Sequence, residues 1–374
     1  MKQQPKINSS LEGVVVGETA ISNVDGHAGK LSYRGINIED LVNRPQWDIA
    51  ARLSCSHEPS REELHEFSDF MRRHSFLEDH ELELVRALDP RLHPMLMLQA
   101  LMPALPIAKD DLIPLPLNAS DIGHGYVLAA KIPALLCAWR EREVGGENYH
   151  ETYDVNEYDN PSASFLARFP GATNSALAIE ILNATQVLQM EHSFNASTFA
   201  GRVCASTNAP IQSVLSVSFG TLYGSLHGGA DQAALEMAQH IGGAENAEGF
   251  VADALARKQK IMGMGHREYK VVDPRAELLK PMARKLCNAG GPLELFETLV
   301  AVEQSCQGHF AKSGKQIWAN VEYYKGAVFH ALGIPSHYFT ALFAMARVFG
   351  YLAHYEEFQR DARLIRPSAK YIGL

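Results

Sequence analysis

The sequence lacks the motifs of the commoner cofactor- and metal-dependent enzymes. It contains no Walker loop, no Rossmann glycine fingerprint, no Gly-x-Ser-x-Gly elbow and no His-Glu-x-x-His pair. Its five cysteines are scattered and include no Cys-x-x-Cys pair, which excludes the usual zinc and dithiol motifs and indicates reduced thiols. We therefore predict no metal site and no permanently bound cofactor.

The chain also lacks a basic excess and a targeting segment. Its 34 Lys and Arg residues are outnumbered by 43 Asp and Glu residues, for a net charge of −9 over 374 residues, and no basic face stands out for nucleic acid. No apolar run follows residues 1–6, as a signal peptide requires. The most apolar segment, residues 338–353, is too short to span a bilayer and contains Arg347. We expect a cytoplasmic protein with no nucleic-acid partner and no membrane partner.

Helical periodicity dominates from residue 38 onward. Ser60 precedes an amphipathic pattern with Glu63 three positions later, which predicts a capping box. Sheet signals are confined to residues 11–40, where Asp25 and Gly26 between apolar runs predict one small β-hairpin. The predicted fold class is all-α, with fifteen or more helices and a small N-terminal β-hairpin element. Further helices are expected over residues 94–102, 122–141, 173–204 and 336–358, and a surface loop over 145–162.

Two glycine-rich patches, at residues 224–229 and 324–333, flank a more polar stretch. Glycines at such junctions can act as hinges between two bodies. We predict a large helical domain made of residues 1–227 and 327–374, with a small helical domain, residues 228–326, inserted into it.

Two glycine-flanked histidine segments organise the chain. Residues 225–230 (SLHGGA) contain His227, and residues 263–270 (GMGHREYK) contain His266. Glycine lets the backbone bend sharply and leaves the imidazole edge open to a ligand. The helix start that follows the first segment would favour a neutral His227, able to donate to a developing oxyanion. Taken alone, His227 is more often a turn histidine without a role, whereas His266 is equally compatible with a solvated basic loop.

Cations gather beside the second histidine on a chain whose net charge is negative. Arg267, Lys270 and Arg275 lie within nine residues of one another, which favours a phosphate or carboxylate ligand. Two histidines together with several cations predict an anionic substrate that carries a carbonyl group to be polarised.

Four further polar residues are candidates, each with a plain structural alternative. Arg347 interrupts an apolar helical stripe and needs an anion, either an internal carboxylate or one from a substrate. Glu322 stands among apolar and aromatic neighbours, where burial would raise its pKa and suit it to general-base work, unless it is a paired structural carboxylate. His192 is a core histidine unless a ligand reaches it. Arg366, before Pro367, is expected to be exposed.

Taken together, these segments resemble the citrate synthase family, which includes 2-methylcitrate synthases. The likeness runs along nearly the whole chain. It implies a citrate synthase-like two-domain helical fold whose small domain closes over the site, in a homodimer or a higher oligomer. The motifs that carry the likeness are residues 18–22 (ETAIS), 31–35 (LSYRG), 191–197 (EHSFNAS), 226–230 (LHGGA), 263–270 (GMGHREYK), 273–275 (DPR), 320–324 (NVEYY), 333–335 (GIP), 346–354 (ARVFGYLAH), 366–367 (RP) and 371–373 (YIG).

The resemblance implies an acyltransferase of the tricarboxylic acid cycle type. Acetyl-CoA, or a short acyl-CoA such as propionyl-CoA, condenses with oxaloacetate by way of an enol or enolate, and thioester hydrolysis gives citrate or 2-methylcitrate and CoA. Coenzyme A thioester is then a co-substrate. The implied catalytic residues are His227 at the thioester carbonyl, His266 at the oxaloacetate ketone and Glu322 as the base. The implied oxaloacetate ligands are His192, Arg275 and Arg347, with Arg366 reaching the partner subunit's site. The implied CoA-binding residues are Lys260, Met262, Gly263, Gly265, Arg267, Lys270 and Asn320.

The sequence departs from the family pattern around the base. The family normally carries aspartate at the position of Glu322, serine at that of Lys325 and asparagine at that of Asp231, and it usually reads Asp-His-Glu at residues 191–193. An extra methylene displaces a carboxylate by about 1 Å, which can cost about 100-fold in rate. The alternatives are a specialised alkylcitrate synthase, an enzyme of the citryl-CoA lyase type, or a weakly active ligand-binding paralogue.

Overall fold

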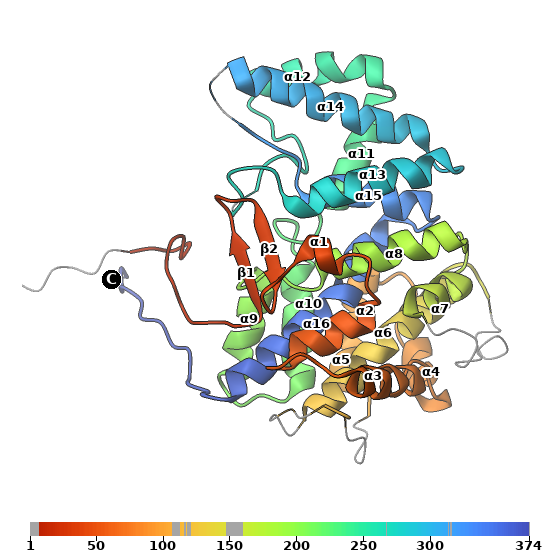
Figure 1. The fold of residues 1–374 in the computed structure, drawn as a ribbon, viewed down its shortest axis with the longest axis vertical. Coiled ribbons are helices and arrows are strands. Elements are labelled where there is room, and N and C mark those ends of the chain that lie inside the picture. Colours follow the sequence, from red (N-terminus) through yellow and green to blue (C-terminus); the bar gives the residue numbers. More distant parts are fainter. Residues whose placement is uncertain are drawn as a thin grey trace, which may run out of the picture.

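The fold is built almost wholly from helices (Figure 1). The computed structural model describes residues 7–106, 113–115, 117, 121–146, 160–266, 268–312, 314 and 316–373. This part of the chain contains sixteen α-helices and one small sheet, which confirms the all-α prediction. The helices are α1 (Ile38–Leu41), α2 (Gln46–Ser54), α3 (Arg61–Arg73), α4 (Asp79–Ala87), α5 (Pro94–Ala104), α6 (Ile122–Glu143), α7 (Pro161–Arg168), α8 (Ala176–Gln189), α9 (Ala196–Ala205), α10 (Ile211–Leu222), α11 (Ala230–Ile241), α12 (Ala247–Ala256), α13 (Pro274–Asn288), α14 (Leu293–Lys312), α15 (Val321–Ala331) and α16 (Phe339–Gln359), with 3-10 turns η1 (Ala244–Asn246) and η2 (Ser336–Tyr338).

The predicted hairpin is present near the N-terminus. Strands β1 (Ser22–Asp25), β2 (Lys30–Tyr33) and β3 (Ile36–Asn37) form an antiparallel sheet in that order. The Asp25 carboxylate accepts hydrogen bonds from the backbone N–H groups of His27 and Ala28, at 3.0 and 2.8 Å, and so fixes the turn. The turn then docks on the loop after α12, because the N–H of Lys270 donates to the carbonyl oxygen of Gly26 at 2.8 Å.

Replacing Gly26 by alanine is expected to destabilise the protein by about 1–3 kcal/mol, because the new Cβ would overlap the carbonyl oxygen of Glu268. The hairpin would have to withdraw from the loop that carries His266. Urea unfolding measures the change. Gly249→Ala is the matched control, since no atom lies within 4 Å of a Cβ there and alanine favours helix. Equal stabilities for the two variants would contradict the packing argument.

Helix α16 is the central element of the larger part of the molecule. Its residues are buried from Phe339 through Glu356, and it packs against α2, α5, α6, α8, α9 and α10 (Figure 1). Within the described residues, α6 rather than α16 has the length and composition of a membrane-crossing helix, yet 89% of its apolar window is buried inside the protein. Burial of this kind is typical of a core helix.

One predicted helix is in fact two. The sequence predicts a continuous helix over residues 173–204, whereas α8 ends at Gln189 and α9 begins at Ala196. The break is stabilised locally: Ser193 adopts a left-handed φ of 52° and its N–H donates to the Glu191 carboxylate. The break turns His192 out of helical register. The capping box of Ser60 and Glu63 is confirmed, while most of the predicted loop at 145–162 lies outside the described residues.

Helices α11 to α15 lie together at the top of Figure 1, with α12 and α14 outermost. Helix α15 packs against α11, α13 and α14 there, and it also reaches α8 and η2 below. The predicted boundary between residues 326 and 327 falls inside α15, which is continuous from Val321 to Ala331. The division into two domains stays a prediction.

Candidate active site

A cluster of aromatic side chains joins two distant segments. The ring of His192, in the break between α8 and α9, lies 5.4 Å from that of His266 and 5.6 Å from that of Tyr269, centroid to centroid. The Tyr269 hydroxyl lies 3.2 Å from Nε2 of His192. Two of the predicted site histidines therefore meet, and Tyr269, a residue of the His266 segment to which the sequence assigned no role, contacts both rings.

A buried guanidinium borders this cluster. Arg275, in the first turn of α13, is held by Asp273 through Nε at 3.0 Å and Nη2 at 2.8 Å. Burial would raise the pKa of the Asp273 carboxyl, but the charge and hydrogen bonds of Arg275 outweigh it and lower that pKa. Asp273 also caps α13 and accepts from the N–H of Val321 at 3.1 Å. One carboxylate thus fixes Arg275 and joins α13 to the start of α15.

His266 and Arg275 present converging N–H groups. Nδ1 of His266 accepts from the backbone N–H groups of Glu268 and Tyr269, at 3.0 and 3.2 Å, so a neutral ring carries its proton on Nε2. That nitrogen lies 3.4 Å from Nη2 of Arg275. Two donors cannot bond to each other, so the pair suits the oxygen of a ligand. Burial, helped by the Arg275 charge, lowers the pKa of His266 to about 4 and keeps the ring neutral near pH 7.

The lowered pKa of His266 makes stability depend on pH. Between its ordinary pKa of 6.5 and about 4, the unfolded chain binds a proton at this ring that the folded protein does not. The free energy of unfolding should therefore fall as the pH drops through this range. His266→Asn, which keeps an acceptor near the Nδ1 position, should lose less stability between pH 7 and pH 5 than the wild type in urea unfolding. Identical losses would contradict the assignment.

Arg347 is a buried cation that forms no ion pair within the described residues. Its side chain lies on α16, 2% exposed, with Nε donating to the carbonyl oxygen of Gln189 at 2.7 Å. The guanidinium carbon lies 4.6 Å from the centre of the Phe343 ring. The Glu191 carboxylate attracts this charge but forms no ion pair with it, and a buried charge without such a pair is costly. The arrangement therefore favours the second of the two sequence alternatives, a carboxylate from a ligand.

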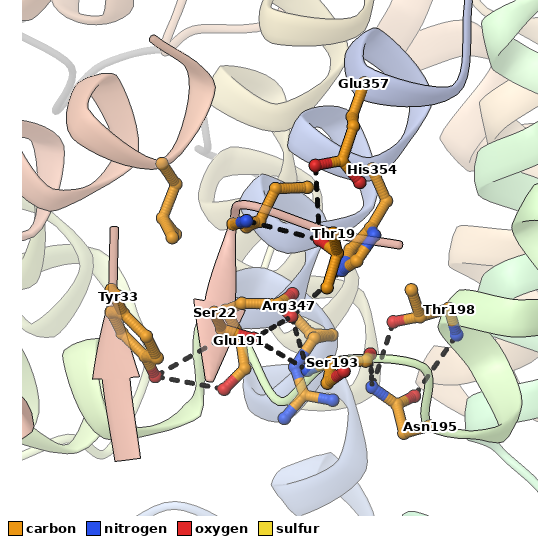
Figure 2. A network of polar contacts seen from close by, with 12 residues as sticks. Thr19, Ser22, Tyr33, Glu191, Ser193, Asn195, Thr198, Arg347, His354 and Glu357 are labelled. Carbon is orange, nitrogen blue, oxygen red and sulfur yellow. Dashed lines mark hydrogen bonds and ion pairs between the residues drawn. The ribbon is translucent and has the colours of Figure 1, made fainter. Parts of the chain in front are cut away.

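A polar network behind Arg347 holds this region in place (Figure 2). Oε1 of Glu191 accepts from the Ser22 hydroxyl at 2.9 Å and lies 2.9 Å from Nε2 of His354. Arg202 donates to Nδ1 of His354 at 3.1 Å, which assigns the ring proton to Nε2 and makes it a donor to Glu191. Arg202 also pairs with Glu357 at 3.2 Å. The network ties β1, the α8–α9 break and α16 together, and so positions both His192 and Arg347.

His227 is oriented by α9 rather than by its own helix. Its Nε2 lies 3.3 Å from the backbone nitrogen and 2.7 Å from the hydroxyl of Ser197, and Tyr351 on α16 donates to that hydroxyl at 2.7 Å. A ring that accepts at Nε2 carries its proton on Nδ1. The sequence placed a helix start after His227, and α11 does begin at Ala230. The helix start that reaches the ring, however, belongs to α9.

Glu322 is a paired carboxylate. It lies in the first turn of α15, and its Oε2 accepts from Nζ of Lys325 at 2.5 Å. The same ammonium lies 3.1 Å from Oδ2 of Asp231 on α11. The approach of α11 depends on Gly326, where a Cβ would lie 2.7 Å from the carbonyl oxygen of Asp231. Burial raises the pKa of Glu322, Lys325 lowers it and Asp231 raises it again, so that the pKa stays above its ordinary value.

The predicted CoA loop runs against the segment before α15. The N–H of Gly265 donates to the carbonyl oxygen of Trp318 at 2.7 Å, and the N–H of Asn320 donates to that of Gly263 at 3.0 Å. The Asn320 amide also donates to the Gly265 carbonyl oxygen at 3.0 Å. The left-handed φ angles of Gly263 and Gly265, 73° and 90°, make this path possible. Of the other residues predicted to bind CoA, Lys260 and Lys270 are exposed, Met262 is half-buried and Arg267 lies outside the described residues.

The structure leaves one predicted residue apart from the rest. Arg366 lies in the extended C-terminal tail, which leaves the body of the molecule (Figure 1), and it is exposed as the sequence predicts. The residues that sequence reasoning missed are Tyr269, Ser197, Tyr351 and Asp273. All four stand inside motifs that carry the family likeness, residues 191–197, 263–270, 273–275 and 346–354, which was the available signal. The contacts of Tyr351 with Ser197 and of Asp273 with Val321 join distant segments, and no local pattern marks them.

Comparisons with known proteins agree on one family. Residues 10–368 match the family described as "Citrate synthase, C-terminal domain". The chain is 35% identical to citrate synthase from Synechocystis, over 100% of this chain and 92% of that protein. It is 31% identical to 2-methylcitrate synthase from Shewanella oneidensis, over 98% and 95%.

Solved structures agree with the sequence relatives. Citrate synthase from Thermotoga maritima superposes with a TM-score of 0.86 at 32% identity, over 99% of this chain and 96% of that chain. A ternary complex of carboxymethyl coenzyme A and oxaloacetate with citrate synthase from Thermoplasma acidophilum gives a TM-score of 0.88 at 27% identity, over 99% and 97%. The chain, with its two-histidine, two-arginine cluster, belongs to the citrate synthase family.

Proposed function

We propose that the protein condenses a short acyl-CoA with oxaloacetate and hydrolyses the resulting thioester, releasing CoA. The observation that carries this proposal is the set of buried groups around His192 and His266. Two imidazoles with lowered pKa lie beside Arg275 and Arg347, and Arg347 forms no ion pair within the described residues. Such a site suits a small dicarboxylate with a ketone, which is the chemistry of oxaloacetate.

The proposed first step forms the carbon nucleophile. Glu322 takes a proton from the carbon next to the thioester carbonyl, while the Nδ1–H of His227 donates to the carbonyl oxygen. Charge that develops on this oxygen is then met by a donor already held in place through Ser197 and Tyr351. Glu322 suits the role of base because burial raises its pKa, which makes its carboxylate more basic.

The proposed second step joins the two substrates. The enolate carbon attacks the ketone carbon of oxaloacetate, and the Nε2–H of His266 with Arg275 stabilises the oxygen that becomes negatively charged. Arg275, Arg347 and His192 would bind the carboxylates. Water then cleaves the thioester bond, and citrate and CoA leave. Propionyl-CoA in place of acetyl-CoA would give 2-methylcitrate, the product named in one relative.

The CoA portion would bind along residues 260–265. In this proposal the nucleotide binds at the backbone turn of Gly263 and Gly265, which Asn320 holds by hydrogen bonds. The exposed side chains of Lys260 and Lys270 face the phosphates of CoA. The small domain, residues 228–326, would close over both substrates and exclude water.

We also propose a cytoplasmic homodimer that serves the tricarboxylic acid cycle. Large apolar side chains near both ends of the described chain support the dimer, since they are exposed to solvent in the single chain: Val15 is 89% and Ile372 89% exposed. In a dimer, the tail would bring Arg366 to the partner subunit. Light scattering of the purified protein should give twice the chain mass.

An assay for free CoA tests the activity. The protein is mixed with oxaloacetate, a thiol reagent and acetyl-, propionyl- or butyryl-CoA, with oxaloacetate left out as the control. We expect release that depends on oxaloacetate and is fastest with one of the two shorter donors. A preference for the longest donor would favour a specialised alkylcitrate synthase. Absence of release with every donor would overturn the proposal.

A further inference from the structure

Three buried charged groups form a cluster that the proposed reaction does not by itself require. The side chains of Lys325 and Asp231 are 0% exposed, and the ammonium lies between Asp231 and Glu322. Two carboxyl groups share one ammonium group. Buried ion clusters are costly to form and are weak evidence for stability. The place of this cluster beside Glu322 points to a functional reason for it.

The ammonium is firmly placed. Lys325 lies one helical turn after Glu322 on α15, so its amine reaches back along the same face. The ring centre of Phe343, on α16, lies 4.1 Å from Nζ, which provides a favourable face for a cation. Asp231 is fixed in turn, because its Oδ1 accepts from the N–H of Gln232 at 2.8 Å. Elements α11, α15 and α16 thus define one position for Nζ.

Only one oxygen of the Glu322 carboxylate is engaged. Oε2 is bound by Lys325, whereas Oε1 has no hydrogen-bond partner in the part of the chain that the structure describes. A carboxylate held at one oxygen presents the other in a fixed direction. Glutamate has one more rotatable bond than aspartate, so the hydrogen bond from Lys325 restricts its conformation more than it would restrict an aspartate.

We propose that Lys325 is a positioning residue for Glu322, binding Oε2 so that Oε1 faces the substrate, and that Asp231 anchors the ammonium. This rests on the proposed function, in which Glu322 is the base. The same contact favours the ionised form of the base, because a positive charge at 2.5 Å opposes the effect of burial.

Removing the positive or the negative neighbour of Glu322 should shift its pKa in opposite directions. The charged groups that face it are Lys325 on its own helix, Asp231 from α11 and Arg275 from α13. Lys325→Met removes the positive neighbour and should move the acidic limb of the kcat profile up by about 1 to 3 pH units. Asp231→Asn removes the negative neighbour and should move that limb down. A merely structural role would not give shifts of opposite sign.

The experiment compares kcat against pH for the wild type, Lys325→Met and Asp231→Asn. We expect Lys325→Met to lose about tenfold or more in kcat at pH 7, with little change in the KM for oxaloacetate. Lys131→Met is the matched control, since Lys131 and Glu81 form a buried pair at 2.8 Å between α6 and α4. It should lower stability and leave the pH profile in place. Shifts of the same sign in the two test variants, or none, would overturn the proposal.

A second measurement does not depend on turnover. Infrared difference spectra between each protein and its Glu322→Gln counterpart report a protonated carboxyl group at this position. At pH 7 we expect no such band in the wild type or Asp231→Asn, and a clear band in Lys325→Met. A band in the wild type, or none in Lys325→Met, would overturn the role of Lys325. A wild type that shows the expected spectra yet releases no CoA would overturn the proposed function alone.

Discussion

Replacing Glu322 by glutamine is expected to lower kcat by about 10³-fold, the usual contribution of a positioned general base, and to leave the affinity for oxaloacetate unchanged. Glutamine keeps the size of the side chain and removes its ability to take a proton. The oxaloacetate groups, on α13, α16 and the α8–α9 break, do not include Glu322. Steady-state CoA release measures kcat, and calorimetry measures oxaloacetate binding.

Glu322→Asp is the companion variant. It keeps the charge but withdraws the carboxylate by about 1 Å from Lys325 and the substrate, so we expect a loss of about 100-fold or less. If Glu322→Gln kept more than a tenth of wild-type activity, another group would have to be the base. If Glu322→Asp were faster than the wild type, the glutamate carboxylate would not be in the best position for proton abstraction.

Replacing Arg347 by methionine is expected to raise the KM for oxaloacetate by about 100-fold while leaving the ligand-free protein about as stable as before. A 100-fold change corresponds to about 2.7 kcal/mol, which lies within the about 1.5–3 kcal/mol that one charge-assisted hydrogen bond to a carboxylate contributes. Stability should change little, because removal of a buried charge that forms no ion pair among the described residues offsets the lost hydrogen bond to Gln189 and the lost attraction to the Glu191 carboxylate.

Thermal unfolding with and without oxaloacetate measures both effects. The wild type should be stabilised by the ligand through mass action, and Arg347→Met should show almost no shift. Arg202→Met is the matched control, because that buried arginine is paired with Glu357 and supports His354. Its removal should destabilise the protein. A destabilised Arg347→Met with normal oxaloacetate binding would mean that Arg347 is a structural cation after all.

Features set by neighbouring residues could be predicted from the sequence. The capping box of Ser60 and Glu63 and the turn at Asp25 both depend on side chains within a few residues of the backbone that they bond. Hydrophobic periodicity likewise located α5, α6 and α16. These local rules suffice for the all-α class.

Contacts between distant segments could not be predicted in the same way. Lys325 and Asp231 are 94 positions apart, and their pairing requires α11 and α15 to pack closely at Gly326. The helix predicted across residues 173–204 was wrong for a similar reason, because Glu191 is bonded by Ser22 and His354. Tertiary hydrogen bonds here overrode an apolar helical pattern.

Three residues that are expected from the sequence to depart from the family pattern lie together in the structure. Lys325 contacts both Glu322 and Asp231. We expect these three residues to be substituted together, because Glu322 is the base, Lys325 binds its carboxylate and Asp231 binds the ammonium of Lys325. Single substitutions should therefore cost more than their combination.

The most direct test of the central claim follows carbon from one substrate to the product. The protein is incubated with oxaloacetate and acetyl-CoA labelled with carbon-13 at both acetyl carbons, and the products are identified by mass spectrometry. We predict citrate that carries both labelled carbons, formed in equal amount to the CoA released. Labelled acetate with unchanged oxaloacetate, or no consumption of either substrate, would contradict the assignment of this site to carbon–carbon bond formation.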